Sequence, residues 1–253
     1  MTETMGNMNL QDILIIIPAF NEEEAIGHLL DELREVLPGA NVLVINDGST
    51  DWTARVVGDR GVPVLDLPCN LGVGGAVQAG FQYAYEKGYR CVVRIDGDGQ
   101  HPPAEIPKLI KAMEEEETDL IIGSRFRGEK AFVSNLVRYL GVKILALFLS
   151  IICKSRVTDP TSGFLMINRS LLCYFAHEYP VEYPEPEAIA LLRRYGFSFR
   201  EAPVTFRRRT AGRSTIGPFG TLYYMIKVGI ALLVDRIRPI DFRYIRSYLE
   251  KGP

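Results

Sequence analysis

Short apolar runs alternate with amphipathic stretches along the first half of the chain. Residues 13–17 form a continuous apolar run that ends at a proline, which predicts a buried parallel strand. A stretch with apolar residues on one helical face follows, from about residue 22 to the Pro-Gly pair at 38–39, and predicts a helix. The pattern repeats, with further strands expected at residues 41–45, 62–67, 90–93 and 119–123. This order predicts an α/β fold with a doubly wound, mostly parallel sheet.

Polar and glycine-rich segments follow the predicted strands at their carboxyl ends. Doubly wound sheets bind ligands at that edge, so we expect these segments to meet at one binding site. They comprise residues 19–23, 46–51, 70–76 and 94–103. The glycine-rich segment at 70–76 opens the next predicted helix and suits either a phosphate-binding loop or simple close packing.

Two carboxylates stand in the segment that follows the fourth predicted strand. Asp96 and Asp98 are each followed by a glycine, so the backbone can turn tightly and both side chains can face one point. That arrangement suits a hard divalent cation, Mg²⁺ or Mn²⁺, and Gln100 would add a neutral oxygen ligand. The alternative is an ordinary surface turn, because Asp-Gly is a common turn dipeptide.

Composition narrows the class of protein. The chain has 253 residues, of which 47% are hydrophobic and 24% charged, and this suits one large α/β domain with or without an appendage. Its net charge of −2 argues against nucleic acid as a partner. The four cysteines lack metal-binding spacing and no apolar leader precedes them, so we expect reduced cysteines in a cytosolic setting.

Two apolar segments in the second half of the chain differ from the strand–helix pattern. Residues 135–153 have the length of a helix, but their longest stretch without a charge, 144–153, is shorter than the roughly 20 residues of a membrane span. Residues 219–238 are similar, with tyrosines and a lysine near one end and arginines at the other. Such flanks favour amphipathic helices that lie in a membrane interface. The alternative is a pair of internal or dimer-forming helices.

Seven polar and glycine-containing motifs occur in a fixed order along the chain. They are Pro18-Ala-Phe-Asn-Glu-Glu23, Asn46-Asp-Gly-Ser-Thr-Asp51, Asn70-x-Gly-x-Gly-Gly-Ala76, Asp96-x-Asp98-x-Gln100, Gly123-Ser-Arg125, Asp159-x-x-Ser-Gly-Phe164 and Arg209-x-x-Gly-x-Ser214. Together they resemble family 2 glycosyltransferases of the GT-A fold. Within that family the dolichyl/polyprenyl-phosphate sugar synthase branch is the most similar.

The resemblance also implies a domain organisation. Residues 12–216 would form the GT-A catalytic domain, including an interfacial helix at about 135–153. Residues 1–11 are polar and expected to be disordered, and residues 217–253 to form a C-terminal amphipathic segment that associates with a membrane or a partner. We expect peripheral association with the cytoplasmic face of the cell membrane, or a cytoplasmic location. A homo-oligomer or a small membrane-protein partner fits the same segments.

The activity implied is a metal-dependent, inverting transfer of a hexose from a nucleotide sugar to polyprenyl phosphate, either undecaprenyl or dolichyl. A cation held by Asp96 and Asp98 would neutralise the charge that grows on the leaving diphosphate. Asn46 stands where the family usually has a second acidic residue. The residues implied for nucleotide-sugar binding are Pro18, Ala19, Asn21, Glu23, Asp47, Gly72, Asp96, Gly97 and Arg125.

The phosphates of donor and acceptor are expected to meet arginines, because the forked guanidinium suits phosphate oxygens. Arg125 and Arg209 are therefore catalytic candidates on the strength of the resemblance. Thr215 follows the last motif where the family commonly has lysine, and Arg213 is a candidate for the missing charge. The residues implied for acceptor binding are Arg138, Asp159, Ser162, Gly163, Arg209 and Ser214.

Glu185 and Glu187 are further catalytic candidates, ahead of a helix predicted at 188–195. An acidic residue here would act as a general base if the acceptor were a sugar hydroxyl. A lipid phosphate is already anionic and needs positive charge more than a base. Acidic residues and prolines are also typical of a helix N-terminus, which is the structural alternative.

Two other functions fit parts of the sequence. One is transfer to a saccharide or lipid-linked saccharide in cell-surface polysaccharide assembly. The other is a catalytically silent, nucleotide-binding scaffold. The intact pair of Asp96 and Asp98, together with Arg209, argues against the scaffold, because a pure binder does not require them.

Overall fold

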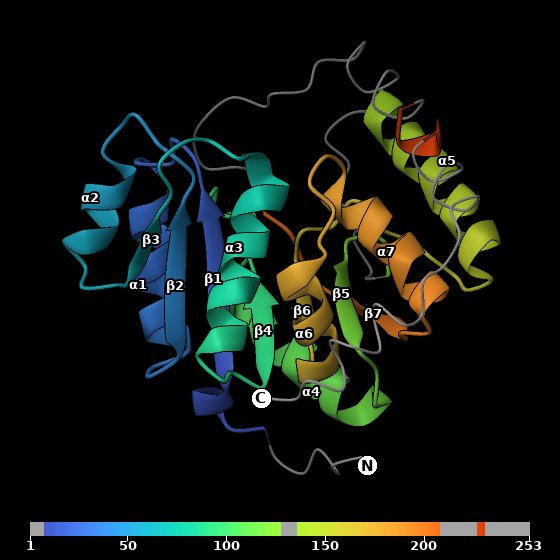
Figure 1. Cartoon of the computed structure of the whole chain (residues 1–253), viewed down its shortest axis with the longest axis horizontal. Coiled ribbons are helices and arrows are strands. Elements are labelled where there is room, and N and C mark those ends of the chain that lie inside the picture. Colours follow the sequence, from blue (N-terminus) through green and yellow to red (C-terminus); the bar gives the residue numbers. More distant parts are fainter. Residues whose placement is uncertain (1–7, 128–135, 208–226, 231–253) are drawn as a thin grey trace.

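The computed structural model describes residues 8–127, 136–207 and 227–230, and one seven-stranded sheet runs through it (Figure 1). The strand order is β3-β2-β1-β4-β6-β5-β7. All neighbouring strands are parallel except β6, which is antiparallel to both β4 and β5. The predicted α/β fold with a mostly parallel sheet is confirmed. The strands are β1 (Ile13–Ala19), β2 (Asn41–Asn46), β3 (Val64–Asp66), β4 (Cys91–Arg94), β5 (Leu120–Ser124), β6 (Leu165–Ile167) and β7 (Phe199–Pro203).

Helices cover both faces of the sheet. The core on one face is built with α3, α5, α6 and α7, and the core on the other face with α1, α2 and α4. In Figure 1, α3, α6 and α7 lie in front of the sheet. The helices are α1 (Ile26–Val36), α2 (Thr53–Gly58), α3 (Gly72–Glu86), α4 (Ile106–Glu116), α5 (Leu136–Cys153), α6 (Arg169–His177) and α7 (Pro184–Tyr195), with short 3-10 turns η1 (Leu10–Asp12) and η2 (Pro103–Glu105).

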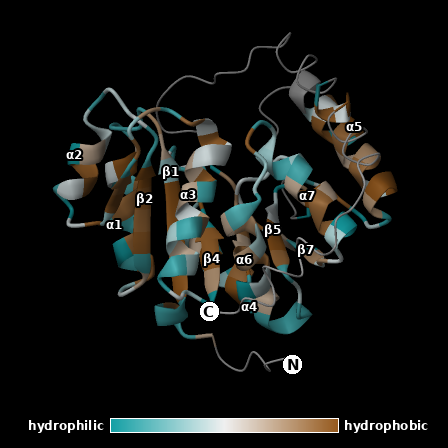
Figure 2. Ribbon diagram, in the orientation of Figure 1, coloured by the Kyte–Doolittle hydropathy of each residue, from teal (hydrophilic) through white to brown (hydrophobic). Residues whose placement is uncertain are grey.

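The alternation of side chains along β1 explains its unbroken apolar run. Leu14 and Ile16 belong to the core shared with α3 and α6, whereas Ile13, Ile15 and Ile17 belong to the core shared with α1 and α4. A strand that is covered on both faces has no polar face, which is why the run reads as continuous. In Figure 2 the hydrophobic residues, coloured brown, are concentrated in the central strands.

The segments expected near a membrane and at the termini are only partly described. Helix α5 coincides with the helix predicted at 135–153, and no helix in the described part of the chain is long and apolar enough to cross a membrane. Near the N-terminus, the backbone N–H of Met8 donates to Oε1 of Glu114 on α4 at 2.9 Å. Of the predicted C-terminal segment, residues 227–230 are helical and the rest lie outside the described residues.

Candidate active site

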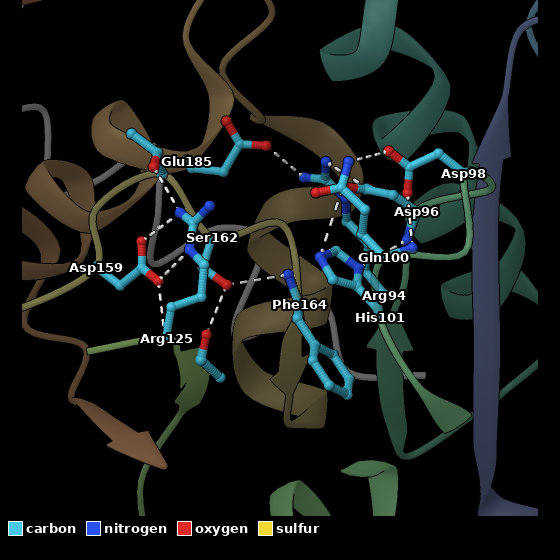
Figure 3. Close-up of polar contacts among 12 residues, drawn as sticks. Arg94, Asp96, Asp98, Gln100, His101, Arg125, Asp159, Ser162, Phe164 and Glu185 are labelled. Atoms are coloured by element: carbon cyan, nitrogen blue, oxygen red, sulfur yellow. Dashed lines mark hydrogen bonds and ion pairs between the residues drawn. The ribbon is translucent and has the colours of Figure 1, made fainter. Parts of the chain in front are cut away.

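The direction of β6 brings two distant motifs to one edge of the sheet. Arg94 on β4 pairs with Leu165 on β6, and the strands run in opposite directions. Continuing that register by two residues sets Asp96 opposite Gly163. A Cβ on Gly163 would lie 2.9 Å from Oδ2 of Asp96, so only glycine leaves room for this carboxylate. The Asp-x-Asp motif and the Ser-Gly-Phe motif are therefore direct neighbours (Figure 3).

Asp96 is held on both sides by basic side chains. Its Oδ1 accepts a hydrogen bond from Nη2 of Arg94 at 3.1 Å, and its Oδ2 lies 3.8 Å from Nε2 of His101. Burial alone would raise the pKa of Asp96, but the neighbouring positive charge, mainly that of Arg94, holds it below its ordinary value. Since the side chain is still 35% exposed, an ionised carboxylate is available at this edge of the sheet.

His101 orients the backbone of the Asp-x-Asp motif. Its Nδ1 accepts a hydrogen bond from the backbone N–H of Asp96 at 2.9 Å, which leaves the ring hydrogen of the neutral form on Nε2. The ring stacks on Phe164 at 5.1 Å and meets the edge of Phe206 at 4.8 Å. Burial lowers the pKa of His101, although Asp96 and Asp98 oppose that shift. These contacts indicate that the imidazole of His101 is neutral and holds the loop in place.

Asp98 and Gln100 contact each other at the tip of the same loop. Both oxygens of Asp98 accept hydrogen bonds from Gln100, from its backbone N–H at 3.0 Å and from Nε2 at 2.6 Å. The amide nitrogen of Gln100, not its oxygen, thus meets the carboxylate. Gly97 lets the loop approach β1, because a Cβ there would lie 3.2 Å from the carbonyl oxygen of Pro18.

The donor set fits a cation that is shared with a substrate. In the residues that the structure describes, no group of three or more His, Cys, Asp or Glu side chains is arranged to hold a metal ion. Mg²⁺, however, commonly binds through one or two carboxylates and completes its coordination with water and substrate phosphates. Asp96 and Asp98 would supply that kind of partial site, and their contact with a cation stays a prediction. Gln100 as a third ligand stays a prediction.

The predicted nucleotide residues at the tips of β1 and β2 connect three loops. Oδ1 of Asn21 accepts from the backbone N–H of Thr50 at 2.9 Å, and Oε2 of Glu23 accepts from that of Trp52 at 2.8 Å. The Asp47 backbone N–H donates to the carbonyl oxygen of Ala19 at 2.9 Å, and its Oδ1 accepts from the N–H of Leu71 at 2.7 Å. These side chains fix the loops at this edge; their contact with a nucleotide stays a prediction.

The glycine-rich segment is the first turn of α3. Gly72 has a φ of +78°, which favours glycine, and it begins the helix. A Cβ on Gly74 would overlap the carbonyl oxygen of Val181 and would lie 2.6 Å from that of Pro180. The close approach therefore joins α3 to the loop before α7, which accounts for Gly74 by packing.

Arg125 follows β5 and is clamped by Asp159. Oδ2 of Asp159 accepts from the Arg125 backbone N–H at 3.0 Å and from Nε at 2.7 Å, and Oδ1 accepts from Nη2 at 2.6 Å. The Asp159 side chain is fully buried, so it acts through Arg125. Ser162, another predicted acceptor residue, donates from Oγ to the carbonyl oxygen of Gly123 at 2.6 Å.

Two charged residues at the site had not been singled out from the sequence. Glu201 on β7 supports the clamp, since its carboxylate accepts from the backbone N–H of Thr158 at 2.7 Å and from that of Asp159 at 3.0 Å. Arg94 is buried, and its Nη1 lies 2.9 Å from Oε1 of Glu185. A charge at the end of an apolar strand, directly before the Asp-x-Asp motif, is the signal that could have indicated Arg94.

The remaining candidates are placed less completely. Glu185 and Glu187 both lie in the first turn of α7, which confirms the expectation of a helix N-terminus there. Arg138 lies in α5, but its side chain is outside the described part of the structure. Arg209 and Ser214 are outside the described residues altogether.

Three curated relatives of the chain have names that refer to polyprenyl-type phosphates or to their sugar-bearing products. An undecaprenyl-phosphate mannosyltransferase from Micrococcus luteus is 41% identical over 118 residues, which cover 45% of this chain and 48% of that protein, so the chain aligns with about half of it. A polyprenol monophosphomannose synthase from Mycolicibacterium smegmatis is 29% identical over 248 residues, covering 91% of both chains. A UDP-N-acetylglucosamine--dolichyl-phosphate N-acetylglucosaminyltransferase from Methanococcus voltae is 27% identical over 250 residues, covering 88% of this chain and 98% of that one.

The fold is shared with a solved enzyme. Glucosyl-3-phosphoglycerate synthase from Mycobacterium tuberculosis, in complex with Mn²⁺, UDP and glucosyl-3-phosphoglycerate, superposes with a TM-score of 0.69 at 22% identity. The match covers 91% of this chain and 81% of that one, and it shows the fold. Residues 14–175, well over half of the chain, match the sequence model described as glycosyl transferase family 2. On this match and the GT-A fold, the chain belongs to glycosyl transferase family 2.

Proposed function

We propose that this glycosyltransferase moves a hexose from a nucleotide sugar to polyprenyl phosphate with inversion at the sugar. One juxtaposition supports the proposal above all. An arginine oriented for phosphate, Arg125, and the carboxylates of Asp96 and Asp98 lie at the same edge of the sheet. The curated relatives from Micrococcus and Mycolicibacterium are named for transfer to, or synthesis on, polyprenyl-type phosphates, which favours the same acceptor class.

We expect the acidic and the basic side chains of the site to have different roles. Asp96 and Asp98 would hold a divalent cation, Mg²⁺ or Mn²⁺, whose chemistry is to stabilise the negative charge on the departing diphosphate. Arg125 offers a guanidinium whose position is set by Asp159 before any ligand binds. Gly163 keeps the space beside Asp96 free of side-chain atoms. The other predicted donor and acceptor residues belong to this proposal on the strength of the family resemblance.

The surroundings of Glu185 favour an anionic acceptor over a sugar hydroxyl. A general base needs an oxygen directed at the proton that it removes. Oε1 of Glu185 instead lies 2.9 Å from the Arg94 guanidinium, and the carboxylate is 15% exposed. Glu185 is therefore a poor candidate for a base. A phosphate oxygen that is already charged has no such requirement.

Helix α5 carries a surface that suits a membrane interface. Leu140, Ile144, Leu147 and Ile151 are each more than half exposed and recur at spacings of four, three and four, so they lie on one face. We call these four residues the α5 stripe. The opposite face, with Leu145 and Leu149, is buried in the core. We include peripheral association with the cytoplasmic face of the membrane in the proposal, because a polyprenyl phosphate is held in a bilayer.

The test is release of nucleoside diphosphate from a panel of sugar nucleotides. Each donor is incubated with Mg²⁺ or Mn²⁺ and with undecaprenyl phosphate, with undecaprenol as the matched acceptor that lacks the phosphate. Release that requires the phosphorylated lipid is the expected result. Release with saccharide acceptors but not with the lipid would favour the polysaccharide alternative, and nucleotide binding without release under any condition would favour the silent scaffold.

A further inference from the structure

Arg94 carries a buried positive charge between two carboxylates from separate parts of the chain. Its side chain is 2% exposed, with Nη2 at 3.1 Å from Oδ1 of Asp96 and Nη1 at 2.9 Å from Oε1 of Glu185. Asp96 follows β4, whereas Glu185 lies in the first turn of α7, 89 positions later. Figure 3 shows the guanidinium between the two acidic side chains.

A buried guanidinium requires a compensating negative charge. Leaving such a charge without a partner is strongly destabilising, so its counter-ions are not free to leave. If Asp96 were the only counter-ion of Arg94, binding a cation at Asp96 would draw that charge away from the guanidinium. Arg94 and the cation would then compete for one carboxylate.

Glu185 removes this competition. Its carboxylate lies 2.9 Å from the other guanidinium nitrogen, so Arg94 keeps a counter-ion while Asp96, whose side chain is 35% exposed, can bind a cation. Gly163 keeps the three groups compact, because a Cβ there would lie 2.9 Å from both Nη2 of Arg94 and Oδ2 of Asp96. The ion pairs therefore leave little room for Asp96 to change position without moving Arg94.

We propose that Glu185 is a positioning residue that acts through Arg94 to keep Asp96 available for a divalent cation. This inference rests on the proposed function, which places a cation at Asp96 and Asp98. It assigns Glu185 a role in the cation site although it lies on α7, away from the Asp-x-Asp loop. It also links α7, which packs against α5, to that site.

The experiment measures binding of Mn²⁺ alone to the purified full chain, from the free-Mn²⁺ signal in electron paramagnetic resonance. Outer-shell partners of metal ligands typically contribute about 10- to 100-fold in affinity. We expect Glu185→Gln to raise the Kd for Mn²⁺ by about 10-fold or more, and turnover to recover as Mn²⁺ approaches saturation. In an Arg94→Met background the same substitution should change the Kd by less than about twofold, because the intermediary is absent.

A second variant separates contact from charge without altering Arg94. Glu185→Asp keeps the negative charge but is one methylene shorter, so it should behave like Glu185→Gln if the contact matters. An Asp variant with wild-type affinity, or an equal effect of Glu185→Gln in both Arg94 backgrounds, would show that only long-range charge acts and would overturn the inference.

Two further outcomes also count against the inference. An unchanged Kd with turnover that stays low at saturating Mn²⁺ would place Glu185 directly on the reacting groups. A wild-type chain that binds no Mn²⁺ would overturn the inference as well, whereas lipid-dependent release of nucleoside diphosphate is judged separately and would still support the transfer reaction. Circular dichroism and melting temperature confirm that each variant is folded.

Discussion

Asp159 fixes Arg125 by three hydrogen bonds, two to Oδ2 and one to Oδ1. The carboxylate is fully buried, and both of its oxygens accept hydrogen bonds from this one residue. Asp159 therefore orients the guanidinium of Arg125. A cation oriented by a rigid partner loses less entropy when it meets a phosphate. We therefore propose that the Asp159–Arg125 pair is a preformed anion-binding element.

Asp159→Asn should loosen this element and destabilise the fold. The amide retains one acceptor oxygen and sets an NH₂ group against the guanidinium, which leaves a buried charge poorly compensated. Breaking a buried ion pair costs about 3 kcal/mol or more, and we expect a loss of that size in urea denaturation, together with a raised KM. Thr161→Val is the matched control, since it removes only the 2.8 Å bond from Nη2 of Arg125 to a neutral hydroxyl. Equal losses for both variants would contradict a special role of the ion pair.

Asp98→Ala should abolish transfer and leave the fold intact. Its carboxylate accepts two hydrogen bonds from Gln100 in the same loop, and the side chain is only partly buried, so we expect its removal to leave the core packing intact. Stabilisation of a leaving group by a metal ion is worth several kcal/mol, so the rate should fall at least ~100-fold. Nucleoside diphosphate release measures this, with the exposed Asp59 replaced by Ala as control. Near-normal turnover with Mg²⁺ or Mn²⁺ would show that the cation site is misplaced.

Gly163→Ala should reduce turnover although it adds a single methyl group. That methyl group would approach Nη2 of Arg94 and Oδ2 of Asp96 to 2.9 Å, so the ion pair has to shift. A misplacement of this kind near reacting groups can cost about 10- to 100-fold in rate. Gly58→Ala on α2 is the control, because its added Cβ meets nothing within 4 Å. Steady-state kinetics of both variants decide the matter, and equal activity would refute the argument.

Charge introduced into the α5 stripe should weaken membrane association. Replacing Ile144 or Leu147 by Glu adds a charge on the exposed apolar face without touching the buried one. We expect less of the protein to co-sediment with vesicles that contain anionic lipid, at an unchanged melting temperature. Val36→Glu, at an exposed apolar position on α1, is the control and should bind as the wild type does. High salt or alkaline carbonate should remove at least part of the wild-type protein from membranes.

Stability should fall in alkaline solution through Cys91. Burial raises the pKa of the Cys91 thiol from its ordinary value of 9.0 to about 12. As the pH rises, the thiol of the unfolded chain therefore loses its proton before that of the folded chain. The contribution of Cys91 to the free energy of unfolding is fully present below pH 9 and declines as the pH rises from 9 towards 12. Urea midpoints at about pH 8 and about pH 10 measure this decline, and Cys91→Ala should reduce it. An equal decline in the variant would assign the effect to other groups.

Strands whose two faces are both buried could be predicted from the sequence. At its length, the apolar run Ile13–Ile17 indicates a buried strand. The motifs that follow each such strand indicate the edge of the sheet at which the site lies. Strand β6 could not be predicted, because the three residues Leu165–Ile167 show no periodicity. Its antiparallel direction is set by packing between β4 and β5, which no local pattern encodes.

The partners of the charged side chains could not be predicted from the sequence either. Arg94 and Glu185 are 91 positions apart, and only the folded chain shows that they form an ion pair. Asp159 was predicted at the site but as an acceptor contact; its side chain instead binds Arg125, and its backbone N–H donates to Glu201 from β7. The residue types needed for the chemistry could be predicted, whereas the pairs that orient them depend on tertiary contacts.

The position of β6 also bears on the order in which the chain folds. β6 lies between β4 and β5 although it follows both in sequence, and among the described strands the neighbours of β5 are β6 and β7. As a chain grows from its N-terminus, β1 to β4 can assemble first, while β5 waits for a strand that has not yet been made. Pairings between distant segments form slowly, so the completion of the sheet is expected to be a late step. Until then Asp96 and Asp98 lie on a part of the sheet that lacks the arginine clamp, because Glu201, which supports that clamp, lies on β7, and we expect the site to be complete only when β6 and β7 have both joined the sheet.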